Sequence, residues 1–452
     1  MFRRSALVFD VIVVGAGVAG ATAARVAAEE GAEVCLLERK PRREVGVKIC
    51  GDAIGKHHFD EIGLEYPKGE ELESEIKAID VYSPDLRTVF HVPGEGYIVN
   101  RRLFGQRLLK YAIEAGAKFM DLMRVLEPII ENGYVVGVSV RDLRRERIVK
   151  IRGRVVVDAS GFLATVRSKL PREMGVEVRV DPDDAIVAYR EIRRLKEPHD
   201  DPNTCKIYLD ADVACGGYYW IFPRGEDGVN VGLGLQMSKG VLNPKRQLYD
   251  YVLRQPAFAG SKLLDEGGWF VPTRRPLLSM VANGFMAVGD AACQANPLHG
   301  GGMGPSMLGG ILAGEVAAEA ASSGDVSREG LWSYNVRFIE AYGAKQAKLD
   351  VLRILLQKLS NRELNFGMER RLITEDELLR ISTGSSFGLG ALDVIRRLMR
   401  SLENPSLLFR LYRCARLVKE VSRAYAKYPR SPEGFEEWEK VVRELFQRAY
   451  AL

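Results

Sequence analysis

The sequence feature that most constrains this chain is a glycine-rich turn between a short apolar run and an alanine-rich segment. Residues 7–14 are almost continuously apolar, as in a strand that is buried on both faces. Residues 19–30 have the composition of a helix. The turn between them contains Gly15, Gly17, Ala19 and Gly20. Glycines with this spacing permit a tight turn and let the backbone approach a pyrophosphate at the start of the helix. Residues 7–40 are therefore predicted to form a β-turn-α-β unit that binds a dinucleotide.

An acidic residue supports this prediction. Glu38 ends the next apolar strand, 18 residues after Gly20, where an acid that binds the adenosine ribose is expected. A glutamate there favours a ribose without a 2′-phosphate, and the adjacent Arg39 is a further candidate for cofactor contact. An ordinary glycine turn would not require the acid. The turn does not distinguish NAD from FAD, because both bind to this motif.

A second motif favours FAD. Residues 285–292 read Phe-Met-Ala-Val-Gly-Asp-Ala-Ala, an apolar strand that ends at Gly289 and Asp290, and a helix is predicted from about 303 to 322. The motif resembles the second FAD motif of the p-hydroxybenzoate-hydroxylase-like flavoproteins. The resemblance implies that Asp290 binds the ribityl chain and that backbone N–H groups at the helix start face the flavin ring, favouring its anionic reduced form. The loop residues that it implies are Pro297, Gly300, Gly301, Gly302 and Met303.

Two shorter segments fit the same group. Residues 99–104, Val-Asn-Arg-Arg-Leu-Phe, resemble the segment in which the first arginine, here Arg101, contacts FAD. Gly105 stands where an Asp is frequent, which departs from the pattern. Ser160 stands where hydroxylases of the group that use NADPH directly often have an Asp. This substitution counts against such a hydroxylase.

Three further features narrow the family. Residues 48–52 read Lys-Ile-Cys-Gly-Asp, and residues 218–224 read Tyr-Tyr-Trp-Ile-Phe-Pro-Arg, followed after seven residues by Gly-Leu-Gly. The C-terminal third is helical in character and basic. Together these features resemble the geranylgeranyl reductase family, whose pattern is roughly PxxYxWxFPK-x7-8-GxG. Cys215 replaces the usual Pro and Arg224 the usual Lys. The resemblance in motifs covers residues 7 to about 320. The C-terminal region resembles the family only in its helical and basic character.

The resemblance implies an FAD-dependent reductase. Such an enzyme saturates C=C bonds of geranylgeranyl chains in isoprenoid ether-lipid precursors or in geranylgeranyl diphosphate, by hydride transfer from flavin N5 and protonation. The residues implied for catalysis are Cys50, Tyr218 and Trp220. Cys50, Gly51 and Asp52 are implied near the flavin, and Tyr218, Trp220, Phe222, Gly232 and Gly234 near the substrate. For Cys50, a role in the chemistry, in gating, in redox or in packing stays open.

Alternation in the aromatic segment has a physical meaning. Tyr218, Trp220 and Phe222 occupy every second position, so a strand places their rings on one face. The rings either wall an apolar tunnel and stabilise a developing tertiary cation, or fill the core between two lobes. Both interpretations stay open from the sequence.

The fold class predicted for the whole chain is α/β. We expect a Rossmann-like FAD-binding lobe built from discontinuous segments, a β-rich substrate lobe and a helical C-terminal region. Asn132-Gly133 predicts a hairpin turn within a β-meander over residues 120–157. The predicted division is FAD-binding domain 1–75, 101–183 and 280–325; β-rich domain 76–100 and 184–279; helical domain 326–452.

Composition excludes some functions. The 65 basic and 60 acidic residues leave a net charge of +5, too mild to indicate nucleic acid, and no apolar run is long enough to span a membrane. Ten basic and two acidic residues between 396 and 430 predict a basic amphipathic stretch, which suits either solvent or an anionic lipid surface. We expect a cytoplasmic protein, or one peripheral at the inner membrane face. Six scattered cysteines form no framework and no metal motif, and a Cys205–Cys215 bridge stays open.

Other assignments follow from these. No second dinucleotide fold is visible, so an external electron donor is expected: reduced ferredoxin, a quinol or NAD(P)H. His57 and His58 suit a polar helix surface better than a catalytic pair, and His299 suits flavin contact. The main alternative function is an FAD-dependent monooxygenase or halogenase on a hydrophobic substrate. A flavin-binding protein without catalysis is a weaker alternative, because no motif is degraded.

Overall fold

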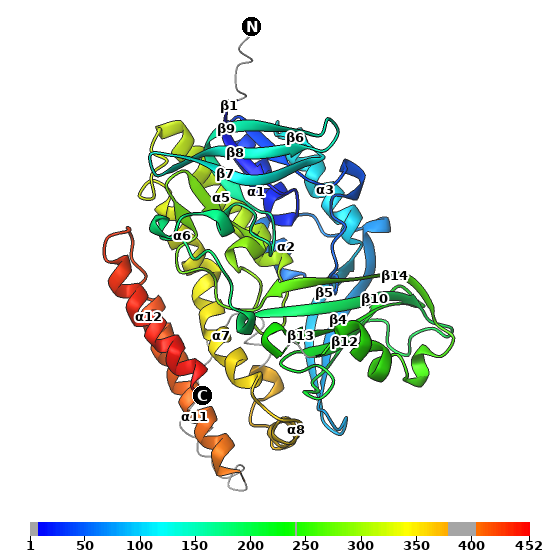
Figure 1. Ribbon diagram of the computed structural model, residues 1–452. Coiled ribbons are helices and arrows are strands. Elements are labelled where there is room, and N and C mark those ends of the chain that lie inside the picture. The colour runs from blue at the N-terminus through cyan, green and yellow to red at the C-terminus, as the bar shows by residue number, and fades with distance from the viewer. Residues whose placement is uncertain (1–7, 240–241, 378–403) are drawn as a thin grey trace.

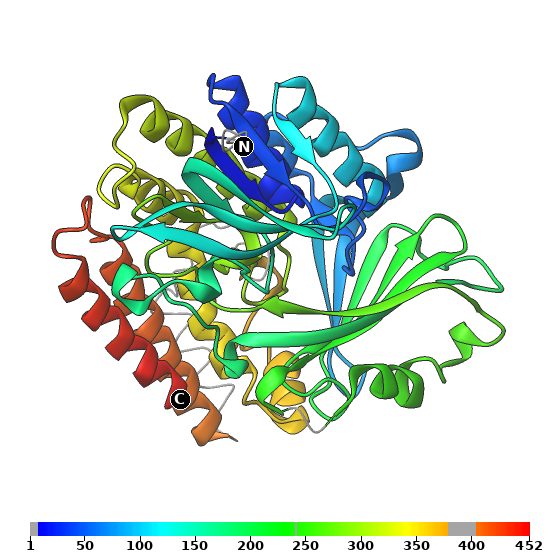
Figure 2. The same cartoon turned by 45° about the horizontal axis from the view of Figure 1, so that its top comes forward.

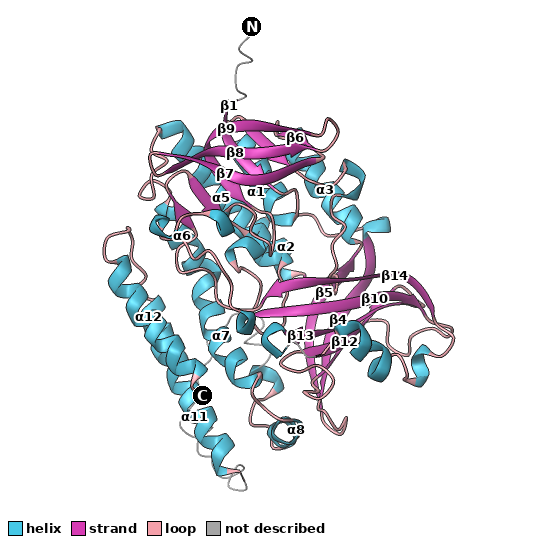
Figure 3. Ribbon diagram, viewed as in Figure 1, coloured by secondary structure: helices cyan, strands magenta, loops and turns pink. Residues whose placement is uncertain are grey.

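The computed structural model of the protein describes residues 8–239, 242–377 and 404–452. Figure 3 shows the strands gathered in two sheets, with the C-terminal helices along one side of the molecule. Figure 1 follows the chain from β1 in the upper sheet, through the lower sheet, to α11 and α12 at the left. Helices α1 and α5 lie behind the upper sheet. The α/β class expected from the sequence is therefore present.

The first sheet contains the predicted β-turn-α-β unit. Its strands are β1 (Val8–Val14), β2 (Val34–Leu37), β6 (Lys118–Met120), β7 (Met123–Glu131), β8 (Tyr134–Asp142), β9 (Arg147–Asp158), β15 (Val281–Ala282) and β16 (Phe285–Ala287). Strand β1 is central and runs parallel to both β2 and β9. Residues 11–14 are almost fully buried, because helices cover one face of the sheet and the β-meander lies over the other.

The predicted β-meander is confirmed. Strands β7, β8 and β9 pair antiparallel in sequence. Asn132 and Gly133 have φ of +51° and +78°, the left-handed conformations that a tight hairpin turn requires. Strand β16 ends at Ala287, earlier than the predicted 290, because Gly289 turns the chain with φ of +68°.

Three helices accompany the first sheet: α1 (Val18–Glu29), α3 (Arg101–Glu114) and α5 (Met303–Ser323). Helices α1 and α5 pack very closely, because a Cβ on Gly310 or Gly314 would lie 2.6 or 2.7 Å from a carbonyl oxygen of α1. The glycines of α5 thus bring the two helices of the two predicted FAD motifs together. Their N-termini face the same end of the sheet.

The second sheet has the order β14-β10-β13-β12-β11-β4-β5-β3. Its strands are β3 (Ala53–Gly55), β4 (Leu72–Tyr82), β5 (Val89–Val99), β10 (Ala185–Arg194), β11 (Thr204–Tyr208), β12 (Tyr218–Arg224), β13 (Gly228–Gln236) and β14 (Lys262–Pro272). Short helices α2 (His57–Ile62) and α4 (Pro244–Gln247) flank it. The aromatic motif forms β12, near the centre of this sheet.

The C-terminal region is helical, as predicted. Its helices are α6 (Trp332–Phe338), α7 (Ala344–Leu356), α8 (Asn361–Glu369), α11 (Pro405–Tyr425) and α12 (Phe435–Tyr450). Helices α11 and α12 lie side by side in both views and pack against α7 (Figures 1 and 2). Residues 396–403 of the basic stretch lie outside the described residues. In the described part of the chain no helix is both long and apolar enough to cross a membrane.

The Cys205–Cys215 bridge that the sequence left open is not formed. All six cysteines are free thiols. Cys205 is 2% exposed and packs among Ile76, Trp220 and Phe222 in the apolar core of the second sheet. Cys215 lies half-buried in the turn that precedes β12. The thiol of Cys205 therefore serves as a small apolar group in the core.

Candidate active site

The first glycine turn leaves a space beside the start of α1. Gly15 has φ of +101°, and a Cβ on Gly20 would lie 1.9 Å from the Gly15 carbonyl oxygen. Both positions therefore require glycine for the turn itself. Gly17 differs, because a Cβ there would meet no heavy atom within 4 Å. The chain thus leaves open the side of the turn where a pyrophosphate approaches the backbone.

Glu38 is fixed next to this turn. Its Oε2 accepts a hydrogen bond from the Ala16 backbone N–H at 2.9 Å, and its Oε1 accepts one from the Lys40 N–H at 2.9 Å. Each carboxylate oxygen has a second lone pair, so both stay able to accept from ribose hydroxyls. The Arg39 guanidinium instead lies 6.0 Å from the centre of the Trp269 ring. Arg39 therefore links this region to β14 of the second sheet.

The second turn touches the first. A Cβ on Gly289 would lie 2.9 Å from the Ala19 Cβ, so these two predicted residues are in close contact. Asp290 follows, is 7% exposed, and accepts from Lys48 Nζ at 2.7 Å. A Cβ on Gly302 would lie 3.4 Å from the Asp290 carboxylate. The structure thus brings both motifs and the start of α5 to one place.

A tight loop from Asn296 to Gly302 precedes α5. The Gly300 N–H donates to the Asn296 carbonyl oxygen at 2.9 Å, and the Leu298 N–H, next to Pro297, donates to the Asn296 side chain at 2.9 Å. Helix α5 then begins at Met303 without a side-chain cap. The first N–H groups of a helix have no partner within it and carry the positive end of its dipole. This start therefore suits an electron-rich group.

Arg101 presents a buried guanidinium to the same region. It is 8% exposed, and its Nη1 contacts the Met303 sulfur. Its Nε finds no hydrogen-bond partner among the described residues, which fits a polar group of a bound cofactor. Gly105 departs from the family pattern and packs closely on Gly46. A Cβ added to Gly105 would lie 2.3 Å from the Gly46 Cα. The open space at Gly17, the start of α5 and this unpartnered nitrogen together fit FAD.

The aromatic strand lies against the cofactor loop. The Tyr218 hydroxyl donates to the His299 carbonyl oxygen at 2.7 Å. The Tyr218 and Trp220 rings lie 6.1 Å apart, and the Trp220 and Phe222 rings 6.2 Å apart. Tyr218 is half-buried, whereas Trp220 and Phe222 are 7% and 8% exposed within the apolar core. Core packing, one of the two interpretations left open, thus holds for Trp220 and Phe222.

The two motif glycines lie behind these rings. Gly234 and Gly232 on β13 pair with Tyr218 and Trp220 on β12. A Cβ on Gly232 would lie 2.5 Å from the Trp220 ring. Gly232 therefore makes room for the indole, which gives the spacing of the motif a packing cause. Nothing in this geometry requires a direct substrate contact from either glycine.

Cys50 lies close to the aromatic strand. Burial raises the pKa of Tyr218, and the neighbouring Cys50 and Cys205 thiols raise it further, which places both thiols near that phenol. The next residue, Gly51, lies on the Phe222 ring, since a Cβ there would come within 3.0 Å of it. Cys50, Tyr218 and Trp220, the residues predicted for catalysis, are therefore brought together.

Asn230, Lys48 and Glu73 are residues of this site to which the sequence analysis gave no role. Asn230 is fully buried and donates both to the Cys50 carbonyl oxygen at 2.8 Å and to Asp52 at 2.9 Å. Glu73 accepts from Arg224 at 2.6 Å. One signal could have found Asn230: it is a lone polar residue within an apolar strand, Gly-Val-Asn-Val-Gly-Leu-Gly-Leu.

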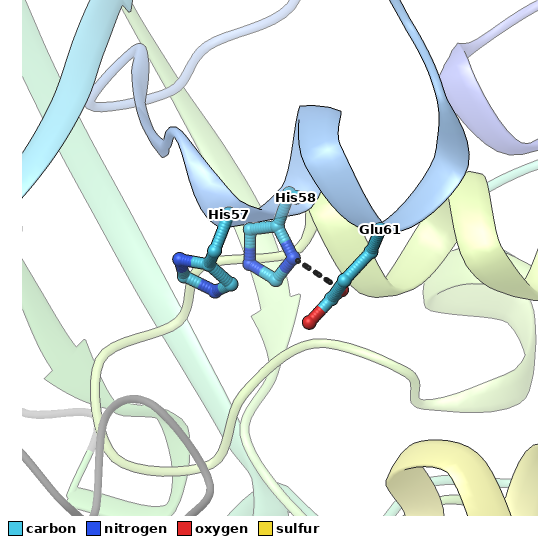
Figure 4. A group of neighbouring side chains, drawn as sticks. All are labelled: His57, His58 and Glu61. Carbon is cyan, nitrogen blue, oxygen red and sulfur yellow. Dashed lines mark hydrogen bonds and ion pairs between the residues drawn. The ribbon is translucent and has the colours of Figure 1, made fainter.

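A polar cluster lies beside the start of α5. His57, His58 and Glu61 present donor atoms within 4.8 Å of one another, and in Figure 4 the His58 ring stands between His57 and the carboxylate. Both histidines are half-buried, and a Cβ on Gly304 would lie 2.1 Å from His58. The polar helix surface expected here is thus partly covered by α5. Burial and the His58 ring lower the pKa of His57 to about 4, and Lys345 adds a positive charge nearby. The nearby positive charge of Lys345 disfavours a cation at this cluster.

Comparisons with known proteins show which family the chain resembles. Residues 184–268 match the family model of the geranylgeranyl reductase catalytic domain, and residues 10–46 match that of the FAD dependent oxidoreductases. The chain is 42% identical to a digeranylgeranylglycerophospholipid reductase of Sulfolobus acidocaldarius, over 96% of this chain and 97% of the relative. It is 36% identical to a digeranylgeranylglycerophospholipid reductase of Methanopyrus kandleri, over 88% of this chain and 98% of that one.

Solved structures show a similar fold. A geranylgeranyl bacteriochlorophyll reductase-like protein of Thermoplasma acidophilum is 26% identical, with a TM-score of 0.75 over 90% of this chain and 99% of its own. A flavin-dependent brominase is 20% identical, with a TM-score of 0.64 over 88% of this chain and 100% of its own. The latter similarity concerns the fold alone.

Proposed function

The chain belongs to the geranylgeranyl reductase family of FAD-dependent oxidoreductases, and from this premise we propose that it saturates the geranylgeranyl chains of a digeranylgeranyl glycerophospholipid. Its cofactor is FAD. Gly17 and the start of α1 receive the pyrophosphate, Glu38 the ribose and Asp290 the ribityl chain. Arg101 and the start of α5 face the flavin ring.

One contact supports this proposal most strongly. The hydrogen bond from Tyr218 to the His299 carbonyl oxygen joins the strand of the reductase motif to the loop of the second FAD motif. It supports a location of the aromatic strand next to the flavin. This strand lies within the residues that match the geranylgeranyl reductase catalytic domain, which favours the reductase over the monooxygenase or halogenase.

The reaction adds a hydride to one alkene carbon and a proton to the other. When bound and reduced, FAD supplies the hydride. An isolated alkene has no carbonyl to accept negative charge, so the proton adds first and positive charge develops on the carbon that awaits the hydride. The Tyr218 ring face stabilises that charge by its attraction for cations. Packing around Trp220 and Phe222 excludes water, which strengthens this attraction.

An anaerobic assay tests the function. The holoenzyme is reduced with dithionite and mixed with a digeranylgeranyl glycerophospholipid, and product masses are recorded. We expect additions of two hydrogen atoms, up to four times for each geranylgeranyl chain. Unchanged lipid beside flavin that stays reduced would contradict the proposal. Oxygen-dependent turnover with a product heavier by oxygen or halogen would instead support the monooxygenase or halogenase.

Cys50 is proposed to act in the chemistry, because its thiol neighbours Tyr218, whose hydroxyl donates to the loop of the second FAD motif. A positioned acid or its support typically contributes 10²–10⁴-fold to rate. Replacing Cys50 with alanine should therefore lower kcat about 100-fold with pre-reduced enzyme. Cys215→Ala is the matched control, because Cys215 is also half-buried and free. Equal turnover of Cys50→Ala and the wild type would remove Cys50 from the chemistry.

An external reductant is proposed to reduce the flavin again after each turnover. Within the described residues, a glycine-rich turn between parallel strands occurs only in the first sheet. These residues therefore contain no second nucleotide-binding fold dedicated to NADPH. Reduced ferredoxin, a quinol and NAD(P)H are the candidates. Anaerobic bleaching of the flavin absorbance by each donor in turn distinguishes them.

Peripheral membrane contact is proposed for α11. Phe409 and Tyr412 are 61% and 60% exposed on one face of this helix, and Arg416 and Lys419 follow on the same face. Exposed aromatic rings beside cations suit an anionic lipid surface. The occupant of this face would be the membrane that holds the lipid substrate.

Vesicle binding tests this contact. Replacing Phe409 and Tyr412 by serine should lower co-sedimentation with anionic phospholipid vesicles about fivefold, because each ring contributes apolar burial. Tyr251→Ser is the control, since Tyr251 is 55% exposed outside this helix. Binding that is equal on neutral and anionic vesicles, or equal in all variants, would contradict the proposal.

A further inference from the structure

The segment that carries Cys50 ends in a backbone conformation that its contacts must support. Asp52 has φ of +65°, in the left-handed region that residues other than glycine seldom adopt. Such a conformation is strained, so it persists only where surrounding contacts fix it. Asp52 is 1% exposed. Its contacts therefore help to decide where Cys50 lies.

Asn230 supplies those contacts from β13. Its Nδ2 donates to Asp52 Oδ2 at 2.9 Å and to the Cys50 carbonyl oxygen at 2.8 Å. Its Oδ1 accepts from Trp220 Nε1 at 2.9 Å. An indole N–H can only donate, so this bond fixes which way the amide faces. One buried side chain thus connects Asp52, the Cys50 backbone and the aromatic strand.

A pair of charges supports the carboxylate. Arg224 Nη1 lies 3.3 Å from Asp52 Oδ2, and its Nη2 lies 2.6 Å from Glu73 Oε1. The other oxygen of Asp52, Oδ1, finds no hydrogen-bond partner among the described residues. The network therefore binds Oδ2 of Asp52, while Oδ1 stays free to accept a proton.

We propose that Asp52 is a positioning residue: through Asn230, its carboxylate holds the Cys50 backbone and the Trp220 indole in one rigid unit beside the cofactor loop. The Phe222 ring, on which Gly51 packs, prevents movement of the segment toward the strand. This inference rests on the proposed reductase function, because the unit serves to place Cys50 against the aromatic wall. It assigns Asp52 to the protein scaffold, not to direct contact with FAD.

The charges around Asp52 predict a pH dependence. Burial raises its pKa to about 6, and Arg101 from α3, Arg190 from β10 and Arg224 from β12 oppose that rise, as does the Asn230 amide from β13. The ionised carboxylate makes stronger bonds to these donors than the protonated one. Turnover of pre-reduced enzyme should therefore fall as the pH drops through about 6, and recover as it rises.

Asp52→Asn tests the inference. The variant keeps the shape of the side chain and an oxygen that can accept from Asn230, but removes the charge. We expect kcat to fall about tenfold, with KM and the FAD Kd within about twofold, and the inflection near pH 6 to disappear. Cys50 should react with iodoacetamide about fivefold faster, measured by peptide mass in a Cys215→Ser background.

Asp265→Asn is the matched control. Asp265 also pairs with one of the three arginines, Arg190 at 2.8 Å, but is 59% exposed. Its replacement should change neither kcat nor the alkylation rate of Cys50. A control that behaves like Asp52→Asn would show that the effect comes from arginine charge in general and would overturn the inference.

Two results would overturn the inference directly. One is unchanged kcat and unchanged Cys50 alkylation in Asp52→Asn. The other is weakened FAD binding with normal kcat at saturating FAD, which would make Asp52 a cofactor contact. If the variant does not fold, the wild type provides the test: the alkylation rate of Cys50 is divided by that of Cys215 on either side of pH 6. A ratio that does not change through pH 6 overturns the inference. Alkylation needs no lipid substrate, so its result tests the role of Asp52 even if the reductase assay shows no activity.

Discussion

Replacing Gly17 with alanine should remove FAD from the protein while leaving the chain folded. A Cβ at this position meets no protein atom within 4 Å, so it enters only the space assigned to the pyrophosphate. Gly17 has φ of −69° and ψ of −177°, which alanine adopts without strain. We expect the FAD Kd to rise at least about 100-fold, or ~2.7 kcal/mol, by equilibrium dialysis or flavin fluorescence.

The stability of the apo-protein provides the internal check. Unfolding of apo Gly17→Ala in urea should stay within about 1 kcal/mol of the wild type, since an N-cap alanine is only modestly worse than glycine. Gly94→Ala is the control, because a Cβ on Gly94 also meets no protein atom within 4 Å. It should bind FAD normally. Normal FAD binding by Gly17→Ala would contradict the location of the pyrophosphate.

The parts of the site that the sequence predicts are local ones. Gly15 and Gly20 are required by the turn that they form, because one needs a positive φ and the other lies against its carbonyl oxygen. The position of Glu38 follows from the length of the strand that it ends. The shared face of Tyr218 and Trp220 follows from the two-residue repeat of a strand. Such features depend on neighbours within a few residues, so the residue types alone reveal them.

The parts that the sequence does not predict are contacts between distant segments. Asn230 reaches Cys50 and Asp52 across about 180 positions of sequence, and Lys48 reaches Asp290 across 242. Nothing near Lys48 indicates that partner. Cys205 shows the same limit, because its distance from Cys215 in sequence permits a bridge while its side chain packs into the core. Which segments meet depends on the order of strands in the two sheets.

A buried charge cluster, also composed of distant residues, joins the C-terminal helices to both sheets. Asp350 on α7 is fully buried and lies 3.0 Å from Nη1 of Arg275, in the segment that leads into β15 of the first sheet. It also accepts from Arg353 Nε at 3.0 Å, and Arg353 reaches Asp184, which leads into β10 of the second sheet, at 2.7 Å. Arg275 stacks 3.7 Å from the centre of the Phe446 ring on α12. The cluster therefore helps to fix the position of one sheet relative to the other.

Removing one charge from this cluster should destabilise the protein strongly. Asp350→Ala leaves Arg275 buried without its carboxylate and removes one of the two carboxylates that Arg353 pairs with. Breaking a buried ion pair in this way typically costs 3–5 kcal/mol, because the remaining charge stays desolvated. We expect a decrease of about 4 kcal/mol in the free energy of unfolding, measured by urea denaturation of the holoenzyme.

An exposed aspartate gives the contrast that tests this explanation. Asp250 pairs with Arg246 and Arg254 at 3.3 and 3.4 Å, but its side chain is 37% exposed, so Asp250→Ala should cost less than about 0.5 kcal/mol. Burial opposes the ionisation of Asp184, yet Arg274 and Arg353 outweigh it and hold its pKa below the usual value. The cluster should therefore stabilise the wild type above about pH 4 and lose that contribution as the pH falls further. Equal losses in both variants would show that desolvation of the remaining arginines is not what makes Asp350 important.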